Sequence, residues 1–299
     1  MKRTKLYALV SSRTILANLL VIVLPAAGLA EEGASLSEPV YRVGKTPQED
    51  SIPASTVARE IPFDLQARPG EHPLMPALRA AQQGLQEIDE NIQDYSCTLV
   101  KRERVQGVLS EPQFMFVKVR HEPFSVYSYF LKPYKGQEIL YVDGQNNGEL
   151  LALAHDWRRR LGVVSLNPTG TLAMKGQKYP VTKLGLRNLT AELIQVAQND
   201  IQYGECEFNY SYNARINDRP CTKLEVIHPV PRKNFRFHIA KIYIDNELRV
   251  PIRYASWLWP TRPGEEPPLE EEYTYTNLKL NNGYTDTTFS QQNPEIFRR

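Results

Sequence analysis

The sequence lacks the short motifs that mark common enzyme classes. Its most patterned stretch, residues 95–153, has no nucleophile elbow, no phosphate-binding loop and no metal-ligand spacing. Because these motifs supply nucleophiles, phosphate cradles and Lewis acids, the sequence predicts a protein that is not an enzyme and needs no cofactor.

Histidine is also scarce. The five histidines are His72, His121, His155, His228 and His238. None shares an HxH or HxxxH spacing beside a carboxylate, so a metal site would have to be assembled across the fold. We therefore predict no metal site.

Long apolar runs are missing except at the N-terminus. Ile15 to Leu24 is apolar, follows the basic residues Lys2, Arg3, Lys5 and Arg13, and is broken by Pro25. A membrane-spanning helix needs about 20 apolar residues. Residues 1–30 are therefore interpreted as a signal peptide cleaved before Glu31, which predicts export to the periplasm or the medium.

No strong excess of one charge remains after this cleavage. Residues 1–30 hold four of the 36 Lys and Arg and none of the 34 Asp and Glu, which leaves 32 basic and 34 acidic residues, a net charge of −2. Nucleic-acid binding needs a basic face. The densest basic run, Arg158–Arg160, is typical of a solvated turn, so nucleic acid is excluded as a partner.

Cysteine is rare too. The three cysteines are Cys97, Cys206 and Cys221, and export permits a disulfide. Cys206 and Cys221 are the favoured pair. A turn at Asn217-Asp218 would place Cys221 opposite about residue 215, so the pair would have to meet across neighbouring strands. Cys97 is interpreted as a buried free thiol.

The chain divides into a tether and one domain. Residues 31–73 are rich in proline and poor in apolar periodicity, which predicts a disordered tether. The alternative is an irregular arm packed on the domain. Residues 74–299 fit a single domain with its own core.

Two helices and many strands are predicted in that domain. The first helix has an apolar stripe of Leu74, Leu78, Ala81, Leu85, Ile88 and Ile92, and the second runs from about Leu186 to Ile201. The remaining apolar runs are short and separated by turn residues, which favours antiparallel strands. The order is helix, about five strands, helix, about five strands.

This order predicts an α+β fold in which a curved antiparallel sheet, a half-open β-barrel, wraps around the helices. Some strands, such as residues 126–131, are apolar on both faces. Such a strand must be covered on both faces or line a cavity on one of them. A groove between sheet and helices is the expected ligand site.

Aromatic residues are the candidates for lining that groove. Those in predicted strands are Tyr127, Tyr129, Tyr141, Tyr254, Trp257 and Trp259. Ordinary core packing is the competing interpretation. Two acidic groups, Glu103 and Glu270–Glu272, are candidate catalytic or cation-binding carboxylates, but exposed charges on a strand and a solvated loop are favoured for them.

The sequence resembles a known family. YSCTLVKRERVQG, KVRHEPFSVYSYFLKPYKGQEILYVDGQNNGELLA, IYIDNELRVPIRYASWLWP, EEYTYTNLKLNNGYTD and the closing NPEIF are similar to exported bacterial proteins grouped as domain of unknown function fifteen-seventy-one. The resemblance covers nearly all of residues 75–297. Since that family has no established activity, it implies no catalytic residue.

A more distant resemblance, by element order, is to periplasmic lipoprotein carriers (LolA-like half-barrels) and envelope-stress regulators. It implies an apolar cavity under the sheet. The sequence therefore predicts binding or carriage of an apolar small molecule or lipidated protein, with transient membrane contact. The alternatives are an interaction or sensor protein that holds a partner peptide in the same groove, and a hydrolase with a dispersed site.

Overall fold

A computed structural model of the chain describes residues 63–298. Two α-helices, α1 (Met75–Asn91) and α2 (Leu186–Asp200), agree with the predicted helices to within two residues. The strands are β1 (Asp94–Val105), β2 (Val108–Leu109), β3 (Gln113–Arg120), β4 (Ser125–Lys132), β5 (Glu138–Val142), β6 (Leu150–Leu153), β7 (Val164–Leu166), β8 (Glu207–Ile216), β9 (Arg219–Ile227), β10 (Ile239–Asp245), β11 (Pro251–Trp257) and β12 (Leu269–Leu280).

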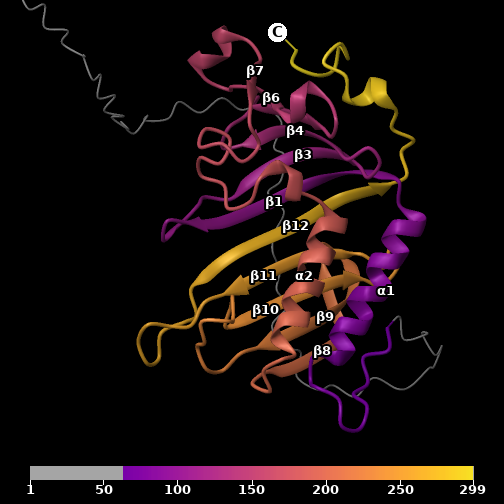
Figure 1. The fold of residues 1–299 in the computed structure, drawn as a ribbon, viewed down its shortest axis with the longest axis vertical. Helices are drawn as coiled ribbons and strands as arrows, with labels where there is room; N and C mark the ends of the chain where they lie inside the picture. Colours follow the sequence, from indigo (N-terminus) through magenta and orange to yellow (C-terminus); the bar gives the residue numbers. More distant parts are fainter. Residues whose placement is uncertain (1–62, 299) are drawn as a thin grey trace, which may run out of the picture. The chain divides into compact units, whose positions relative to one another are not determined.

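The strands form one open antiparallel sheet of 12 strands (Figure 1). The spatial order is β7-β6-β5-β4-β3-β1-β12-β11-β10-β9-β8, and β2 pairs only with β1. Two meanders of hairpins therefore meet where the first strand pairs with the last. The predicted α+β class, an antiparallel sheet that is not closed and carries helices, is confirmed.

Both helices lie on the same face of the sheet and pack against each other (Figure 1). The main core lies beneath them and includes Ile88 of α1, Leu186 of α2 and Leu99 of β1. Leu186 begins α2, and its N–H donates to the buried Tyr95 hydroxyl at 2.9 Å. This bond ties the start of α2 to the central strand β1.

The C-terminal segment, residues 284–298, explains why β4 is apolar on both faces. Neighbouring strand residues point to opposite faces. Val126 belongs to the core beneath the helices, whereas Tyr127 packs with Phe289, Ile296 and Phe297 of the C-terminal segment. The sheet is thus covered on both sides at β4.

Part of the predicted tether is ordered, so the prediction of disorder is wrong for residues 63–73. Phe63 and Leu65 are buried against β9 and β10. Glu71 forms an ion pair with Arg79 of α1 at 2.5 Å. These residues form the irregular packed arm that was the alternative interpretation, and the buried side chains of Phe63 and Leu65 are part of its contact with the domain. Residues 31–62 lie outside the described residues, as does the predicted signal peptide.

Gly84 in the middle of α1 should be replaceable. A Cβ there would lie 3.9 Å from the Arg249 carbonyl oxygen, an ordinary contact. Because glycine is a poor helix former, Gly84→Ala is expected to raise the free energy of unfolding by about 0.5–1 kcal/mol. Urea denaturation of the protein would measure the change.

Gly185→Ala is the matched comparison, because it is expected to change the free energy of unfolding in the opposite direction. The φ of Gly185 is +118°, and a Cβ would lie 2.8 Å from the Tyr95 hydroxyl. That substitution should therefore destabilise the protein. A loss of stability in Gly84→Ala would show that the middle of α1 is packed more tightly than the structure indicates.

Candidate functional site

An apolar cavity of about 80 Å³ lies between the two helices and strands β9 and β10. The sheet side of its wall is made by Leu224 and Val226 of β9 and by Ala240, Ile242 and Ile244 of β10. Phe63 and Phe237 close it from two connecting segments. The predicted cavity between sheet and helices is thus present in the structure.

Small residues on α1 leave this space open. The α1 side of the wall carries Ala77, Ala80, Ala81 and Gly84. Each side chain is one methyl group or none, so helix and sheet stay packed while the volume between them remains unfilled. The cavity is about half the size of an engineered cavity of roughly 150 Å³ that binds benzene.

Asp200, the last residue of α2, is the one acidic side chain in the cavity wall. It is 1% exposed, and its Oδ1 accepts a hydrogen bond from the Asn199 side chain at 3.3 Å. Oδ2 has no hydrogen-bond partner and lies 3.4 Å from His228 Nε2. Burial raises the pKa of the Asp200 carboxyl to about 6.

His228 is fully buried behind Asp200. Its Nδ1 lies 3.1 Å from the Phe237 carbonyl oxygen, and its ring stacks on Phe235 at 3.9 Å. Since a carbonyl oxygen only accepts, Nδ1 carries the proton in the neutral ring. Burial lowers the pKa of His228 and raises that of Asp200, which favours the neutral form of both groups, with the Asp200 carboxyl as the donor to Nε2.

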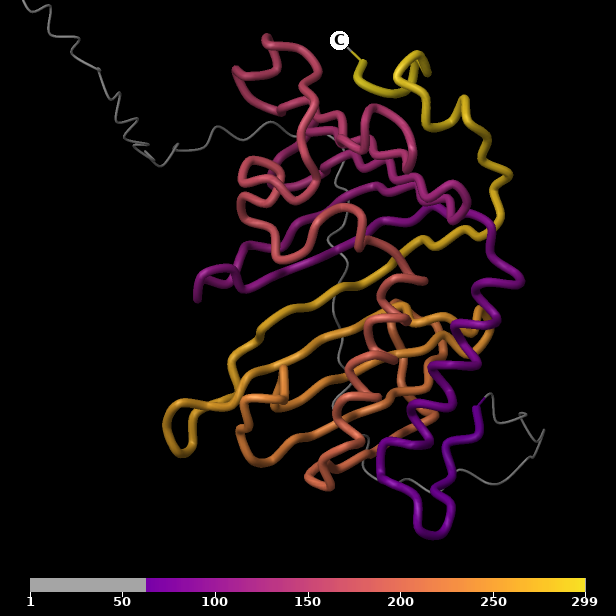
Figure 2. The backbone as a smooth tube through the Cα atoms, viewed as in Figure 1, coloured from indigo at the N-terminus to yellow at the C-terminus, as the bar shows by residue number. Residues whose placement is uncertain are grey.

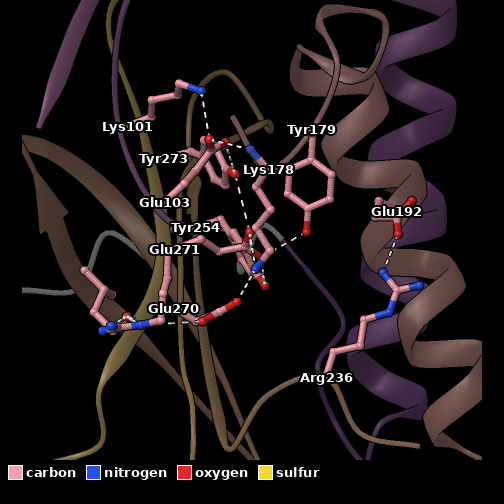
Figure 3. Close-up of polar contacts among 12 residues, drawn as sticks. Lys101, Glu103, Lys178, Tyr179, Glu192, Arg236, Tyr254, Glu270, Glu271 and Tyr273 are labelled. Atoms are coloured by element: carbon pink, nitrogen blue, oxygen red, sulfur yellow. Dashed lines mark hydrogen bonds and ion pairs between the residues drawn. The ribbon is translucent and has the colours of Figure 1, made fainter. Parts of the chain in front are cut away.

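A separate polar cluster lies beneath the segment that leads from β7 to α2. Figure 2 shows this segment passing over β1 and β12 before it enters α2. Glu103 of β1 and Glu271 of β12 are directly opposite each other in the strand pairing, and both are buried. The segment contributes Lys178 and Tyr179 to the cluster (Figure 3).

Each carboxylate of the cluster has several donors. Glu103 accepts from the Lys101 ammonium at 3.0 Å, the Tyr273 hydroxyl at 2.7 Å and the Lys178 N–H at 3.0 Å. Glu271 pairs with the Lys178 ammonium at 3.0 Å. The cluster therefore fixes the crossing segment to the centre of the sheet.

Three phenols complete the network. The hydroxyls of Tyr179, Tyr254 and Tyr273 lie 3.4 Å from the Glu271 carboxylate. Burial, followed by the nearby carboxylates, raises the pKa of all three phenols, so they remain protonated donors. The network joins β1, β11, β12 and the segment from β7 to α2.

The sequence-based interpretation of these acidic residues is wrong. Glu103 is 3% exposed, and Glu271 is 6% exposed within β12 rather than in a solvated loop. The segment that leads from β7 to α2 covers this face of the sheet. No sequence pattern around Glu103 shows that residues 177–179 bury it. Glu270 also pairs with Lys178, at 2.6 Å.

The six aromatic residues predicted to line the groove do not line this cavity. Tyr127 and Tyr129 pack with the C-terminal segment, and Tyr254 stacks on Tyr273. Trp257 lies under the Lys241 ammonium, 5.4 Å from its ring centre, and Trp259 donates to the His228 carbonyl at 2.8 Å.

The physical reason is the polar atom that each of these six side chains carries. A buried hydroxyl or indole N–H needs a partner, and Tyr127, for example, donates to Glu138 at 2.9 Å. The cavity wall offers few such partners. Tyr141 lines a second, mainly polar hollow of about 1040 Å³, which also borders Arg120, His121 and Arg187.

The predicted Cys206–Cys221 disulfide is absent, and all three cysteines are free. Cys221 is opposite Ala214 in the β8–β9 hairpin, so the register keeps it away from Cys206, which precedes β8. Cys206 Sγ instead lies 3.9 Å from His72 Nε2. Cys97 is buried, as predicted.

Three of the five histidines gather near Asp200. His72 Nε2 lies 3.0 Å from the Tyr203 carbonyl, and His238 Nδ1 lies 2.8 Å from the His228 carbonyl. Burial raises the pKa of the nearby Cys206 thiol to about 11, which leaves it protonated and poorly nucleophilic. Among residues 63–298, no group of three or more His, Cys, Asp or Glu side chains is arranged to hold a metal ion.

Asp200 was missed by the sequence analysis, although a signal was present. Leu193 and Val196 mark the apolar stripe of α2, and the same spacing continues to Asp200. A carboxylate on the apolar face of a helix, at the end where the helix dipole disfavours negative charge, is unusual. That conflict is the sequence signal for a carboxylate that pairs inside the protein, here with His228.

The fold and the cavity define a class: an open antiparallel sheet that holds an apolar cavity under two helices. The chain belongs to the family described as protein of unknown function (DUF1571), whose family model matches residues 92–296. The sequence resemblance to this family is therefore confirmed. A search of the curated proteins gives no match.

Several solved structures are similar to this chain. Lipoprotein LppX of Mycobacterium tuberculosis is 14% identical, with 71% of this chain and 98% of that chain covered and a TM-score of 0.39. A LolA superfamily protein of Nitrosomonas europaea is 13% identical, with 71% and 97% covered and a TM-score of 0.29. A chain of the MucA/MucB complex of Pseudomonas aeruginosa is 16% identical. The match covers 72% of this chain and 60% of that chain, with a TM-score of 0.40.

No helix among residues 63–298 is long and apolar enough to cross a membrane.

Proposed function

We propose that this protein is an exported envelope protein that binds or carries an apolar ligand in the cavity between its helices and β9–β10. The ligand is an acyl chain, a lipid or a lipid-modified protein segment. The observation that carries the proposal is the cavity wall, in which aliphatic side chains of the sheet face alanine and glycine of α1. The predicted signal peptide supports the envelope location.

Binding would work by reversible burial of apolar surface, worth roughly 25 cal/mol per Å² removed from water. No covalent step is involved. Because the cavity holds only about 80 Å³, a long chain would enter by moving α1 and α2 away from the sheet. The alanine-rich face of α1 suits such a movement, since small side chains interlock little with β9 and β10.

Native mass spectrometry of the exported chain tests this proposal directly. Protein purified from a bacterial periplasm should carry an additional mass of lipid size that organic extraction removes. A clean mass of the chain alone, together with no uptake of added apolar probes, would contradict the proposal.

Filling the cavity should reduce ligand binding. Ala81 lines the cavity, so Ala81→Leu would place three more carbon atoms in the space that a ligand needs. We expect about tenfold weaker binding of a fluorescent apolar probe, since about 1.4 kcal/mol of lost burial corresponds to that factor. Titration of the probe would measure it.

Gln82→Leu is the matched control, because it adds the same side chain to the exposed side of α1. Its probe affinity should remain that of the unmodified protein. If Ala81→Leu binds the probe as tightly as the unmodified protein does, the probe binds outside this cavity.

A second candidate function is recognition of a partner peptide, and the edge strand β8 favours it. β8 pairs only with β9 within the described sheet, so its outer backbone groups are free to add a strand. The irregular register between Ser211 and Ala214 limits the length of such pairing. A ligand-free native spectrum with unchanged probe affinity in Ala81→Leu would favour this function.

A further inference from the structure

The loop between β6 and β7 exposes large apolar side chains. Trp157 and Leu161, at the two ends of a short 3-10 helix, are 72% and 70% exposed. Tyr134, in the turn between β4 and β5, and Val164, the first residue of β7, are also exposed. Tryptophan is highly buried on average in folded proteins, so a ring this exposed on a protein surface calls for an explanation.

The turn and the loop form one tip, which we define as residues 133–136 and 154–164. The strand pairing places them at the same end of the sheet, because Leu153 is opposite Glu138 and Val164 is opposite Ala152. Contacts join them as well. Arg159 Nη1 donates to the Gly136 carbonyl at 2.8 Å, and the His155 ring lies 5.1 Å from the Tyr134 ring.

The contacts of the tip hold Trp157 outward. The Asp156 carboxylate accepts from the Arg158 N–H at 3.0 Å and so caps the short helix. Arg159 points inward, with Nη2 3.6 Å from the buried Glu138 carboxylate. Within residues 63–298, the Trp157 side chain makes no hydrogen bond and no ring contact. The indole is therefore presented to the surroundings by a turn that is itself well fixed.

The tip is positively charged. Its basic residues are Lys135 and Arg158–Arg160, and its one acidic residue is Asp156, a net charge of +3, or +2 if Glu138 is included. The chain that follows adds no negative charge, since residues 157–191 contain seven Lys and Arg and no Asp or Glu. Arg160 is exposed and has no ion pair among the described residues. The tip therefore attracts anionic groups.

We propose that the tip docks on an anionic lipid surface, with Trp157 and Leu161 inserted among the lipid headgroups and Arg160 and Lys135 beside the phosphates. Exposed aromatic and aliphatic side chains combined with basic residues are the features that hold peripheral proteins at the membrane interface. Tryptophan suits the headgroup level because its ring is apolar and its N–H is polar. A protein partner would need a preformed pocket for each side chain, whereas lipids rearrange around it.

This surface is separate from the apolar cavity. β7 and β8 are the two edges of the sheet, and Figure 1 shows them at opposite ends of it. The tip adjoins β7, whereas the cavity lies beside β9 and β10. Docking therefore goes beyond the proposed function and does not depend on a ligand in the cavity.

Vesicle flotation of the protein tests the docking. Vesicles of phosphatidylglycerol and phosphatidylethanolamine should carry the protein to the top of a density gradient, whereas vesicles of phosphatidylcholine alone should carry much less. Added salt should weaken the binding because it screens the charges of the tip. Lipids brominated in the upper acyl chain should quench tryptophan fluorescence, and Trp157→Phe should abolish that quenching.

Trp157→Ser separates insertion from folding, because the side chain is exposed and unsupported. We expect about tenfold weaker binding to the anionic vesicles, since the strength of interfacial binding scales with the apolar area inserted. The unfolding midpoint in urea should not change. Tyr210→Ser is the matched control, because it removes an exposed ring from β8 at the other edge of the sheet, and its vesicle binding should remain that of the unmodified protein.

Arg160→Glu tests the charge of the tip. It changes the charge by two units, so binding to the anionic vesicles should fall by about thirtyfold. Arg215→Glu makes the same change of charge on β8 and should leave vesicle binding unaltered. The stability of both variants in urea would be measured alongside.

Three results would overturn the proposal. The first is absence of binding to either kind of vesicle, which would assign the tip to a protein partner. The second is a folded Trp157→Ser variant that binds as tightly as the unmodified protein. The third is equal binding to anionic and neutral vesicles. None of these results bears on the cavity, which the uptake of apolar probes tests separately.

Discussion

Replacing Glu103 with alanine is expected to lower the free energy of unfolding by about 3–5 kcal/mol, the cost of breaking a buried ion pair by removing one partner. Glu103 is 3% exposed and accepts bonds from Lys101, Tyr273 and the Lys178 backbone. Its loss leaves the Lys101 ammonium with only the Gln177 side-chain oxygen as an acceptor, and the Tyr273 hydroxyl with only the Glu271 carboxylate at 3.4 Å. Urea unfolding followed by tryptophan fluorescence would measure the effect.

Glu111→Ala is the control for this experiment, because Glu111 is an exposed residue just before β3. Its effect should stay within about 0.5 kcal/mol. A loss below about 1 kcal/mol in Glu103→Ala would mean that water replaces the carboxylate easily and that the crossing segment is not sealed. Lys101→Met combined with Glu103→Ala should cost less than the sum of the single changes, since the two residues share one interaction.

Phe289→Ala is expected to have an effect of similar size, about 3–5 kcal/mol, the range for a buried phenylalanine. Phe289 is 2% exposed, packs with Tyr127 and Leu140, and lies under the Arg120 guanidinium at 5.2 Å. Its removal opens a cavity between the C-terminal segment and the sheet. Denaturant titration gives the energy, and hydrogen exchange gives its location.

Exchange should accelerate first in residues 284–298 and in β4 and β5, which that segment covers. Val108→Ala is the control, since Val108 is 72% exposed, and it should change exchange in neither region. Uniform acceleration across the whole sheet would show that the C-terminal segment unfolds together with the domain rather than before it.

The helices were predictable because their apolar residues recur at helical spacing. Ile88 and Leu186 are completely buried, as an amphipathic stripe requires. The antiparallel sheet was predictable for a similar reason: turn residues such as Asn217 and Asp218, both at positive φ, separate short apolar runs. These features depend on neighbours within a few residues.

The site was less predictable, because it depends on segments far apart in the sequence. The burial of Glu103 involves Lys178, and Asp200 at the end of α2 lies beside His228, which follows β9. The positions of the six aromatic rings were not predictable, because apolar character alone does not show which face of a strand meets a helix. Tyr127 faces the C-terminal segment, a cover that no local pattern reveals.

The pairing of β1 with β12 has a consequence for the order in which the chain acquires structure. The two strands are partners from Tyr95 and Leu280 to Glu103 and Glu271, so one edge of β1 stays open until residues 269–280 have emerged. During synthesis or passage through a membrane, β3 to β7 can assemble on β1, whereas β8 to β11 reach the growing sheet only through β12. Contacts this distant in sequence close slowly. Until β12 has emerged, one edge of β1 is therefore open to pairing with other chains, which is a site where aggregation could begin.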